Sequence, residues 1–192
     1  MVIEFVSPMR PMLDLQLRDL PVSGWSYQIK LDEERGILWQ RGLYNRHGKP
    51  VASHKSQAFV AAIAKAREKF GTQTLDVGMI GFRNGALGSG ALVIYDIPTD
   101  TGENWIHRYS GLVTLPVFDP LAAPAKTGEI YRLPHTLFGR IMMSAYKGAP
   151  GVEGVIGRDM RSGYIAGDTR AMLKCKWANQ VPTSFAGVSP AV

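Results

Sequence analysis

Alternating and continuous apolar runs predict β-strands along much of the chain. Trp25–Lys30 (WSYQIK) alternates apolar and polar positions, which is typical of a half-buried strand. Gly36–Tyr44 (GILWQRGLY) is expected to be its antiparallel neighbour, and Ala91–Ile97 (ALVIYDI) is apolar enough for a buried strand. Further strands are predicted at Leu75–Phe82, Glu129–Leu133, Val152–Arg158 and Met172–Trp177.

A smaller number of segments follow the helical period. Ser56–Phe70 places apolar residues on one face and is followed by Gly71, a common helix stop. Helices are also predicted at Leu13–Leu20 and His135–Lys147, whereas Tyr109–Val117 fits either a strand or a short helix. Arg83–Gly90 and Arg161–Arg170 are expected to be loops. Strands interspersed with few helices predict an α+β fold with mainly antiparallel sheets.

Composition narrows the class of protein. The 192 residues carry 45% hydrophobic and 20% charged side chains, as in an ordinary globular domain. The net charge of +6 favours a polyanionic partner, although many proteins of this charge bind no nucleic acid. Cys175 alone excludes an internal disulfide and fits a reducing cytoplasm. No apolar run is long enough for a membrane span, the N-terminal residues lack the pattern of a secretory signal, and no Cys/His spacing indicates zinc.

Candidate chemistry begins with Lys30, which is followed by Asp32 and Arg35. An amine nucleophile beside an orienting acid and a fixed positive charge suits the handling of a phosphate. Each residue also has an ordinary interpretation when taken alone. Lys30 is then a solvated lysine at a strand end, Asp32 is a turn former, and a tyrosine such as Tyr95 belongs to the core.

The order of several such clusters resembles the nucleotidyltransferase superfamily of ATP-dependent DNA ligases, RNA ligases and mRNA capping enzymes. Small phage-type ATP-dependent DNA ligases are the most similar. The family's K-x-D-G motif with a following Arg is matched by Lys30, Asp32 and Arg35, and its S-R-N-G motif by Arg46 and Gly48. Its aromatic-Asp strand, E-G-V-V strand and terminal L-K-x-K are matched by Tyr95-Asp96, Glu153-Gly154-Val155-Ile156, and Lys174 with Lys176. Tyr164 and Gly167 also fit the family's spacing, so that the resemblance covers roughly residues 8–178.

The resemblance implies an α+β nucleotidyltransferase (ATP-grasp-like) domain over residues 1–178, with two mainly antiparallel sheets flanked by helices. Residues 179–192 are expected to form a disordered C-terminal tail. It also implies the reaction of a DNA ligase, which uses ATP and Mg²⁺. A lysine attacks the α-phosphate of ATP to form lysyl-AMP, and the AMP passes to the 5′-phosphate of nicked DNA before the 3′-hydroxyl displaces it. A phage-type enzyme of DNA repair or replication would act in the host cytoplasm.

The resemblance also implies residue roles at the reacting phosphate. Lys30 would be the nucleophile, and Lys174 and Lys176 would be catalytic cations that neutralise the phosphate and favour the neutral amine. Glu153 and Asp32 would hold Mg²⁺, a hard ion that prefers carboxylate oxygen.

Further roles concern the rest of the nucleotide and the nucleic acid. Tyr95 would stack on adenine, and Gln28, next to Ile29 in the nucleotide site, would accept a hydrogen bond from the adenine amine. Arg35 would bind ribose or phosphate, and Arg46 the 5′-phosphate of the nick.

Several positions depart from the family pattern. Glu33 stands where the family has Gly after the Asp, and His47 replaces the Asn of S-R-N-G. The family's central D-G-E or E-G-E motif is expected near Leu75–Ile80, but Gly78 or Met79 occupies the position of its glutamate. The sixteen residues after Lys176 are too few for the OB-fold domain that usually follows.

These departures leave two alternatives open. The first is a catalytically impaired ligase-like module that binds nucleotide, nucleic acid or a protein partner without ligation. A partner of that kind would also be able to supply the missing domain. The second is an RNA ligase, which would act on nicked RNA.

Overall fold

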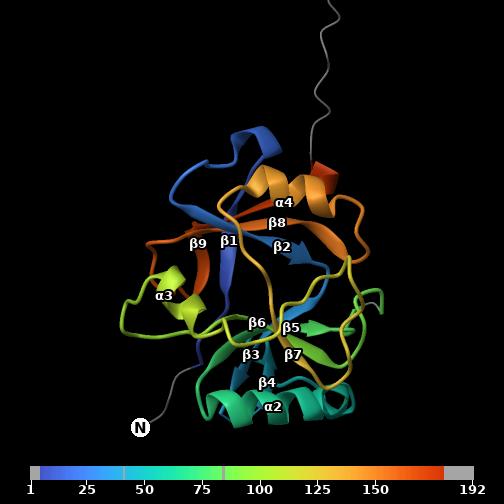
Figure 1. Ribbon diagram of the computed structural model, residues 1–192. Helices are drawn as coiled ribbons and strands as arrows, with labels where there is room; N and C mark the ends of the chain where they lie inside the picture. Colours follow the sequence, from blue (N-terminus) through green and yellow to red (C-terminus); the bar gives the residue numbers. More distant parts are fainter. Residues whose placement is uncertain (1–4, 41, 84, 180–192) are drawn as a thin grey trace, which may run out of the picture.

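The computed structural model describes residues 5–40, 42–83 and 85–179, which form two sheets stacked one above the other (Figure 1). The four-stranded sheet has the order β1-β9-β8-β2, with β1 at Met9–Asp14, β9 at Gly167–Lys176, β8 at Val152–Asp159 and β2 at Trp25–Leu31. The five-stranded sheet has the order β4-β3-β5-β6-β7, with β4 at Gly42–Asn45, β3 at Glu34–Trp39, β5 at Leu75–Ile80, β6 at Ala91–Asp96 and β7 at Ile130–Arg132.

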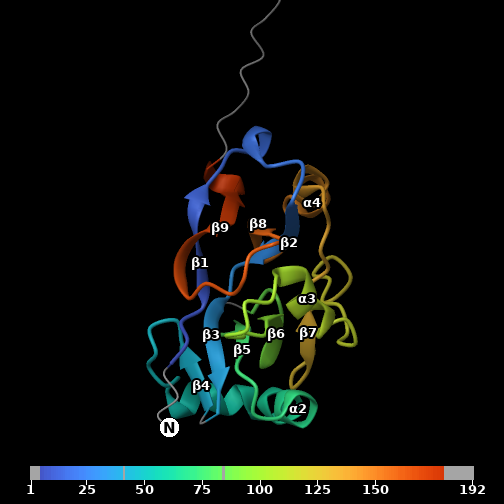
Figure 2. The same ribbon diagram turned by 90° about the vertical axis from the view of Figure 1, so that its left-hand side faces the viewer.

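Helices cover the outer faces of this arrangement. The helix α4 (Gly139–Tyr146) packs against β2 and β8, and α2 (Val60–Phe70) packs against β6 and β7 (Figure 2). The short α3 (Trp105–Ser110) lies beside β6, and α1 (Ser53–Ser56) precedes α2. Three 3₁₀ turns occur at Leu17–Asp19, Gln57–Phe59 and Trp177–Asn179.

The described residues form two hydrophobic cores. Tyr27, Ile29 and Val155 belong to the core beneath α4, which also includes Val93 of the five-stranded sheet. Leu75 belongs to the second core, beneath α2. All six positions of β5 and all six of β6 are buried, because these strands lie in the middle of the five-stranded sheet. This confirms the buried strand predicted at Ala91–Ile97.

The predicted fold class is confirmed, and most strand pairs are antiparallel. The exceptions are β1 with β9 and β6 with β7, which are parallel. A single turn at Asp32 and Glu33 connects β2 in one sheet directly to β3 in the other. The chain therefore crosses between the sheets just after Lys30. The prediction that Gly36–Tyr44 is the antiparallel neighbour of Trp25–Lys30 is wrong, because β2 pairs with β8 and the Gly36–Tyr44 segment contributes to β3 and β4 of the other sheet.

Some predicted elements were wrong. Leu13–Leu20 is not a helix, because Leu13 and Asp14 extend β1 and pair with β9. The apolar-polar alternation of LDLQL is a strand period, and only Leu17–Asp19 turns helically.

Other elements have boundaries that differ from the predicted ones. Strand β9 begins at Gly167, inside the loop predicted at Arg161–Arg170, because β1 pairs with it there. The only helix between β6 and β7 in the described chain is α3, which begins before Tyr109 and is capped by the Asn104 side chain. The second predicted helix is shorter than expected and begins at Gly139. Of the predicted tail, only Asn179 is described, and it ends a 3₁₀ turn at Trp177–Asn179; residues 180–192 lie outside the described residues.

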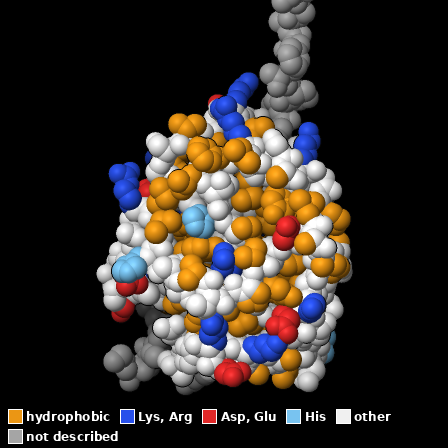
Figure 3. All heavy atoms as spheres, viewed as in Figure 1, with side chains coloured by type: hydrophobic (Ala, Val, Ile, Leu, Met, Phe, Trp, Pro, Cys, Tyr) orange, Lys and Arg blue, Asp and Glu red, His pale blue; other side chains and the backbone are white. Residues whose placement is uncertain are grey.

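The surface shown in Figure 3 is largely hydrophobic and uncharged, with Lys and Arg side chains scattered singly across it. It shows no continuous basic track on this face. None of the helices in the described part of the chain is long and apolar enough to cross a membrane.

Candidate functional site

A cavity of about 400 Å³ lies between the two sheets, and both sheets contribute to its wall. Strands β2, β8 and β9 line it from one sheet, and β3 and β6 line it from the other. Every residue to which the sequence assigned a role lines this cavity: Gln28, Ile29, Lys30, Asp32, Arg35, Arg46, Tyr95, Glu153, Lys174 and Lys176. Residues up to 148 positions apart in sequence, Gln28 and Lys176, therefore share one site.

Lys30 and Lys176 both donate hydrogen bonds to the carboxylate of Glu153. The Lys176 Nζ lies 3.0 Å from Glu153 Oε2, and Lys30 Nζ contacts Oε1. Burial acts to raise the pKa of Glu153, but the hydrogen bonds from the two lysines outweigh it and hold the pKa below its ordinary value. The carboxylate therefore stays ionised between two ammonium groups.

Gly154 explains how these three side chains come together. In the sheet it pairs with Lys30 on one side and with Lys176 on the other. A Cβ at this position would collide with the carbonyl oxygen of Cys175. The glycine after Glu153 thus allows β8 and β9 to approach closely at the point where the two lysines face the carboxylate.

Arg35 is held by Asp76 in a two-pronged ion pair. Its Nε and Nη2 lie 2.8 and 2.7 Å from the two carboxylate oxygens, and Tyr164 donates to the same carboxylate at 2.9 Å. Burial acts to lower the pKa of Arg35, but Asp76 more than offsets it, so the guanidinium remains charged. The guanidinium also lies 5.4 Å from the ring centre of Tyr95. Its predicted ribose or phosphate contact stays a prediction, and its observed partner is Asp76.

Tyr95 lines the cavity but is only 7% exposed. Its hydroxyl donates to Glu33 Oε1 at 2.9 Å, and one ring face has Arg35 over it. Stacking on adenine therefore requires the part of the ring that the cavity reaches, and it stays a prediction.

Gln28 is 2% exposed, and its Nε2 donates to the carbonyl oxygen of Leu133 at 3.4 Å. In this bond the amide nitrogen of Gln28 is the donor. The predicted contact with an adenine amine would use the other end of the amide, its carbonyl oxygen, as the acceptor. The observed orientation is compatible with the predicted role of Gln28.

Arg46 lies at the exposed rim, in the turn after β4. The Asn45 side chain accepts from the backbone N–H groups of His47 and Lys49 at 2.9 and 3.1 Å, which closes the turn, and Gly48 adopts a φ of 74°. Arg46 Nε donates to the His47 ring at 3.1 Å. The turn is therefore formed with His47 at the position where the family has Asn, and the His47 ring accepts a hydrogen bond from Arg46.

Lys174 lies on the same face of β9 as Lys176, two positions earlier. Its Nζ is 3.7 Å from Asp14 on β1. The alternation predicted for the two lysines thus brings both of them to the cavity, each beside a carboxylate.

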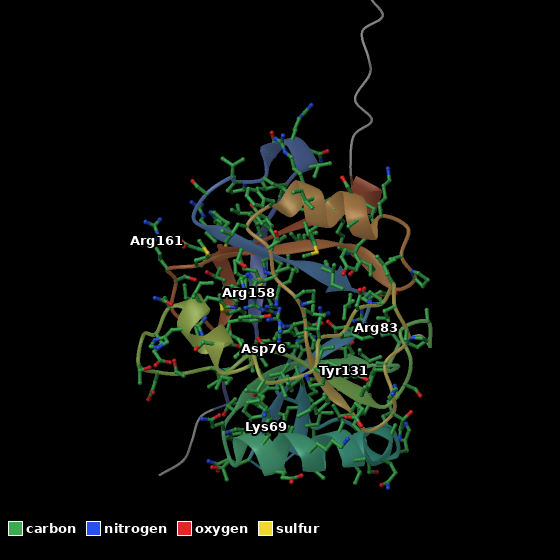
Figure 4. All side chains as sticks on the ribbon, viewed as in Figure 1. Lys69, Asp76, Arg83, Tyr131, Arg158 and Arg161 are labelled. Atoms are coloured by element: carbon green, nitrogen blue, oxygen red, sulfur yellow. The ribbon has the colours of Figure 1, made fainter. Side chains whose placement is uncertain are left out.

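Sequence reasoning missed a buried ion cluster around Asp96, one member of which, Arg158, lines the cavity. Asp96 on β6 accepts from Arg108 at 2.8 and 3.1 Å and from Arg158 on β8 at 3.2 Å. All three side chains are nearly inaccessible to solvent. Figure 4 shows Arg158 near the centre of the molecule, with Asp76 close to it in this view. Neither Arg108 nor Arg158 belongs to a recognisable sequence motif. Only their burial in the fold identifies them as members of this ion cluster.

A metal site made by the protein alone is absent from the described residues, since no three His, Cys, Asp or Glu side chains come together. Mg²⁺ commonly uses one or two carboxylates and completes its shell with phosphate oxygens and water. Glu153 and Asp32 in the cavity wall fit an ion that is shared with a nucleotide.

The sequence matches no protein-family model and significantly matches none of the curated proteins. Solved structures, by contrast, match over nearly the whole chain. The ligase domain of M. tuberculosis LigD has a TM-score of 0.64 and 18% identity, with 91% of this chain and 61% of that chain covered. The chain therefore spans less than two thirds of that relative.

Two further DNA ligase structures give the same result. A Lig E DNA ligase has a TM-score of 0.55 and 14% identity, with 90% of this chain and 69% of that chain covered. Chlorella virus DNA ligase-adenylate has a TM-score of 0.57 and 15% identity, with 89% and 67% covered. The chain thus shares its α+β fold with these three DNA ligase structures.

Proposed function

We propose that the chain is an adenylating domain of the DNA ligase type, with Lys30 as its nucleophile. The observation that carries the proposal is the convergence of Lys30, Glu153 and Lys176 in one cavity whose wall also holds every other residue to which the sequence assigned a role. The ligase-like fold supports the same assignment at the level of the domain.

The proposed step forms a bond between Lys30 Nζ and the α-phosphorus of ATP and breaks the bond from that phosphorus to the bridging oxygen. Pyrophosphate leaves with the electron pair, and the ammonium nitrogen loses two protons in all, so that lysyl-AMP keeps one N–H. Free lysine is protonated at neutral pH, so the ammonium must first lose one proton. Glu153 is the carboxylate in contact with it, and Lys176 is placed to balance the negative charge of the phosphate.

Mg²⁺ would be held by Glu153 and Asp32 together with phosphate oxygens of the nucleotide. When bound, the ion would neutralise phosphate charge and favour the departure of pyrophosphate. The lysine contacts of Glu153 would then be shared with the ion, which would loosen the hold on Lys30.

Intact-mass measurement tests the proposal directly. The purified protein is incubated with ATP and Mg²⁺, and a stable gain of one AMP is expected. The gain should be absent in Lys30→Ala and retained in Lys55→Ala, a matched lysine variant on α1 outside the cavity. If no nucleotide gives an adduct, and none is present after purification, the enzyme proposal is wrong.

The nucleic acid is the next question. Nicked DNA is the proposed acceptor, and sealing of nicked RNA instead would favour the RNA ligase alternative. Binding to nicked DNA should weaken steeply with salt, because the net charge of +6 and the arginine at the rim would displace counterions. A flat salt response would contradict a phosphate-binding role for Arg46. Use of ATP and DNA fits a cytoplasmic protein.

The second candidate is a module that binds nucleotide, nucleic acid or a protein partner without ligation. Gly78 favours it, because no carboxylate projects from β5 at the position where the resemblance implies a glutamate. Nucleotide binding without any lysyl-AMP would support this candidate. A protein partner that completes the domain would be expected to restore sealing.

A further inference from the structure

The segment before β1, residues 5–8, connects the two sheets along one side of the cavity. Met9 begins β1 in the four-stranded sheet, whereas the ring of Phe5 packs on β3 and β4 of the five-stranded sheet. Pro8 lines the cavity, as does Arg46 in the turn after β4. Figure 2 shows the chain running from β1 to the hairpin formed by β3 and β4. This connection, which we call the strap, contains none of the residues to which the sequence assigned a role.

Backbone hydrogen bonds fix the strap where it meets the four-stranded sheet. The backbone N–H of Met9 donates to the hydroxyl oxygen of Tyr164 at 3.2 Å, and the N–H of Gly167 donates to the carbonyl oxygen of Pro8 at 3.3 Å. The Tyr164 hydroxyl in turn donates to Asp76 at 2.9 Å, so that the same tyrosine contacts both sheets. This end of the strap is therefore held by the framework of the domain.

The other end of the strap is anchored by an aromatic cluster. The ring centre of Phe5 lies 6.2 Å from that of Trp39 and 5.9 Å from that of Tyr44, and the latter two are 5.6 Å apart. These separations and the tilted or edge-on geometry are typical of aromatic rings in favourable contact. Phe5 is partly buried in this cluster, so its ring is held against the β3–β4 hairpin.

Phe5 also covers the turn that carries Arg46. A Cβ built at Gly48 would be only 3.1 and 3.3 Å from Cδ1 and Cε1 of Phe5, so the ring lies close against the backbone of this glycine. Gly48 has a φ of 74°, which a residue with a side chain rarely adopts. The turn is thus closed from within by the Asn45 side chain and supported from outside by Phe5.

This support matters because Arg46 itself is exposed. Its Nε donates to the ring of His47, which is exposed as well, so neither side chain is held by burial. A group that must be ordered when a ligand binds costs free energy, and a turn that is already fixed lowers this cost. The position of Arg46 at the rim therefore depends on the backbone of its turn.

We propose that Phe5 is a positioning residue, which holds the turn of residues 45–48 so that Arg46 meets a phosphate of the nucleic acid at the rim of the cavity. The proposal rests on the function proposed above, in which Arg46 binds the 5′-phosphate of the nick. Phe5 is not part of the cavity wall, so it acts through Arg46 and not on the nucleotide.

The test measures Kd for a labelled nicked duplex with a 5′-phosphate at the nick, by fluorescence anisotropy. Arg46→Ala is expected to weaken binding about 10-fold, as for the loss of a hydrogen bond to a charged group. Phe5→Ala should weaken it about 3- to 10-fold, because the turn must then be ordered on binding. In the Arg46→Ala background, Phe5→Ala should change Kd by less than about twofold, because no arginine is left to position.

Two further variants serve as controls. Phe5→Tyr keeps the aromatic ring and should bind within about twofold of the wild type. Phe138→Ala removes a phenylalanine that is 60% exposed at the start of α4, outside the cavity wall, and should leave Kd unchanged. Melting curves establish that each variant is folded at the assay temperature, and Phe5→Leu replaces Phe5→Ala in all comparisons if the alanine variant is not.

The outcomes separate this inference from the function on which it rests. If Phe5→Ala binds like the wild type while Arg46→Ala binds more weakly, the inference alone is wrong. An equal loss in both backgrounds would also overturn it, because Phe5 would then act on the whole domain and not through Arg46. Binding of wild-type strength by Arg46→Ala would instead overturn the phosphate contact in the proposed function, and this inference with it.

Discussion

At the scale of the residue, Glu33 shows how burial changes the chemistry of a side chain. Its carboxylate is placed between the Tyr95 hydroxyl and the backbone of Gly78, and burial raises its pKa from 4.5 to about 7. The folded protein therefore binds a proton that the unfolded chain releases between these two pH values. In that window, stability must fall as the pH rises.

Glu33→Gln carries no titrating group and should not show this fall. From pH 5 to pH 8 we expect the free energy of unfolding of the wild type to drop by about 3 kcal/mol relative to Glu33→Gln. Urea unfolding of both proteins across this pH range measures the difference. Parallel pH profiles would show that Glu33 is ionised throughout and that its environment is more polar than the structure indicates.

At the scale of the element, the approach of β8 to β9 depends on Gly154. A methyl group at this position would meet the Cys175 carbonyl, and the neighbouring strands leave no room to relax because β8 is paired on both sides. The same spacing sets the distance from Glu153 to Lys176. Stability and the geometry of the proposed site thus depend on one backbone contact.

Gly154→Ala is expected to reduce the free energy of unfolding by about 2–4 kcal/mol and to slow adduct formation, because the strands must separate where Glu153 is held. Gly85→Ala is the matched control. Nothing lies within 4 Å of a Cβ there, so its stability should stay within about 0.5 kcal/mol of the wild type. Chemical denaturation and intact mass give the two readouts. Equal stability of the two variants would mean that β8 and β9 tolerate a wider spacing.

At the scale of the whole molecule, buried ion pairs join the two sheets. Asp96 of the five-stranded sheet binds Arg158 of the four-stranded sheet, and the same carboxylate holds Arg108 of α3. Asp76 on β5 is bonded to Tyr164, which lies between β8 and β9. These contacts connect the two sheets that form the cavity wall. They therefore hold the two sides of the wall in a fixed position relative to each other.

Asp96→Ala should therefore cost about 3–5 kcal/mol, because it leaves two buried guanidinium groups without their carboxylate. Asp168→Ala removes a surface partner of Arg10 and should cost about 1 kcal/mol or less. Thermal and urea unfolding of the two variants provide the comparison. A small effect of Asp96→Ala would indicate that water reaches Arg108 and Arg158 and that the sheets are joined mainly by hydrophobic contacts.

The local sequence was sufficient for the elements whose pattern is strongly periodic. The alternation in Trp25–Lys30, the apolar run at Ala91–Ile97 and the helical face ending at Phe70 all correspond to elements of the structure. The helix predicted at Leu13–Leu20 was wrong, because the start of this segment pairs with β9 as a strand instead. Its alternation already fits a strand, but the partner strand that decides the outcome lies more than 150 residues away in the sequence.

The candidate site divides in the same way. The sequence by itself determined which candidate residues are present and in which order they occur, because side-chain type and spacing are local properties. It also marked Glu33 and Gly78 as unusual. Only the tertiary structure decided that the Glu33 carboxylate lies close to Gly78, that Arg35 is paired with Asp76, and that Arg158 is buried against Asp96. Such contacts arise from the pairing and packing of strands that are distant in the sequence.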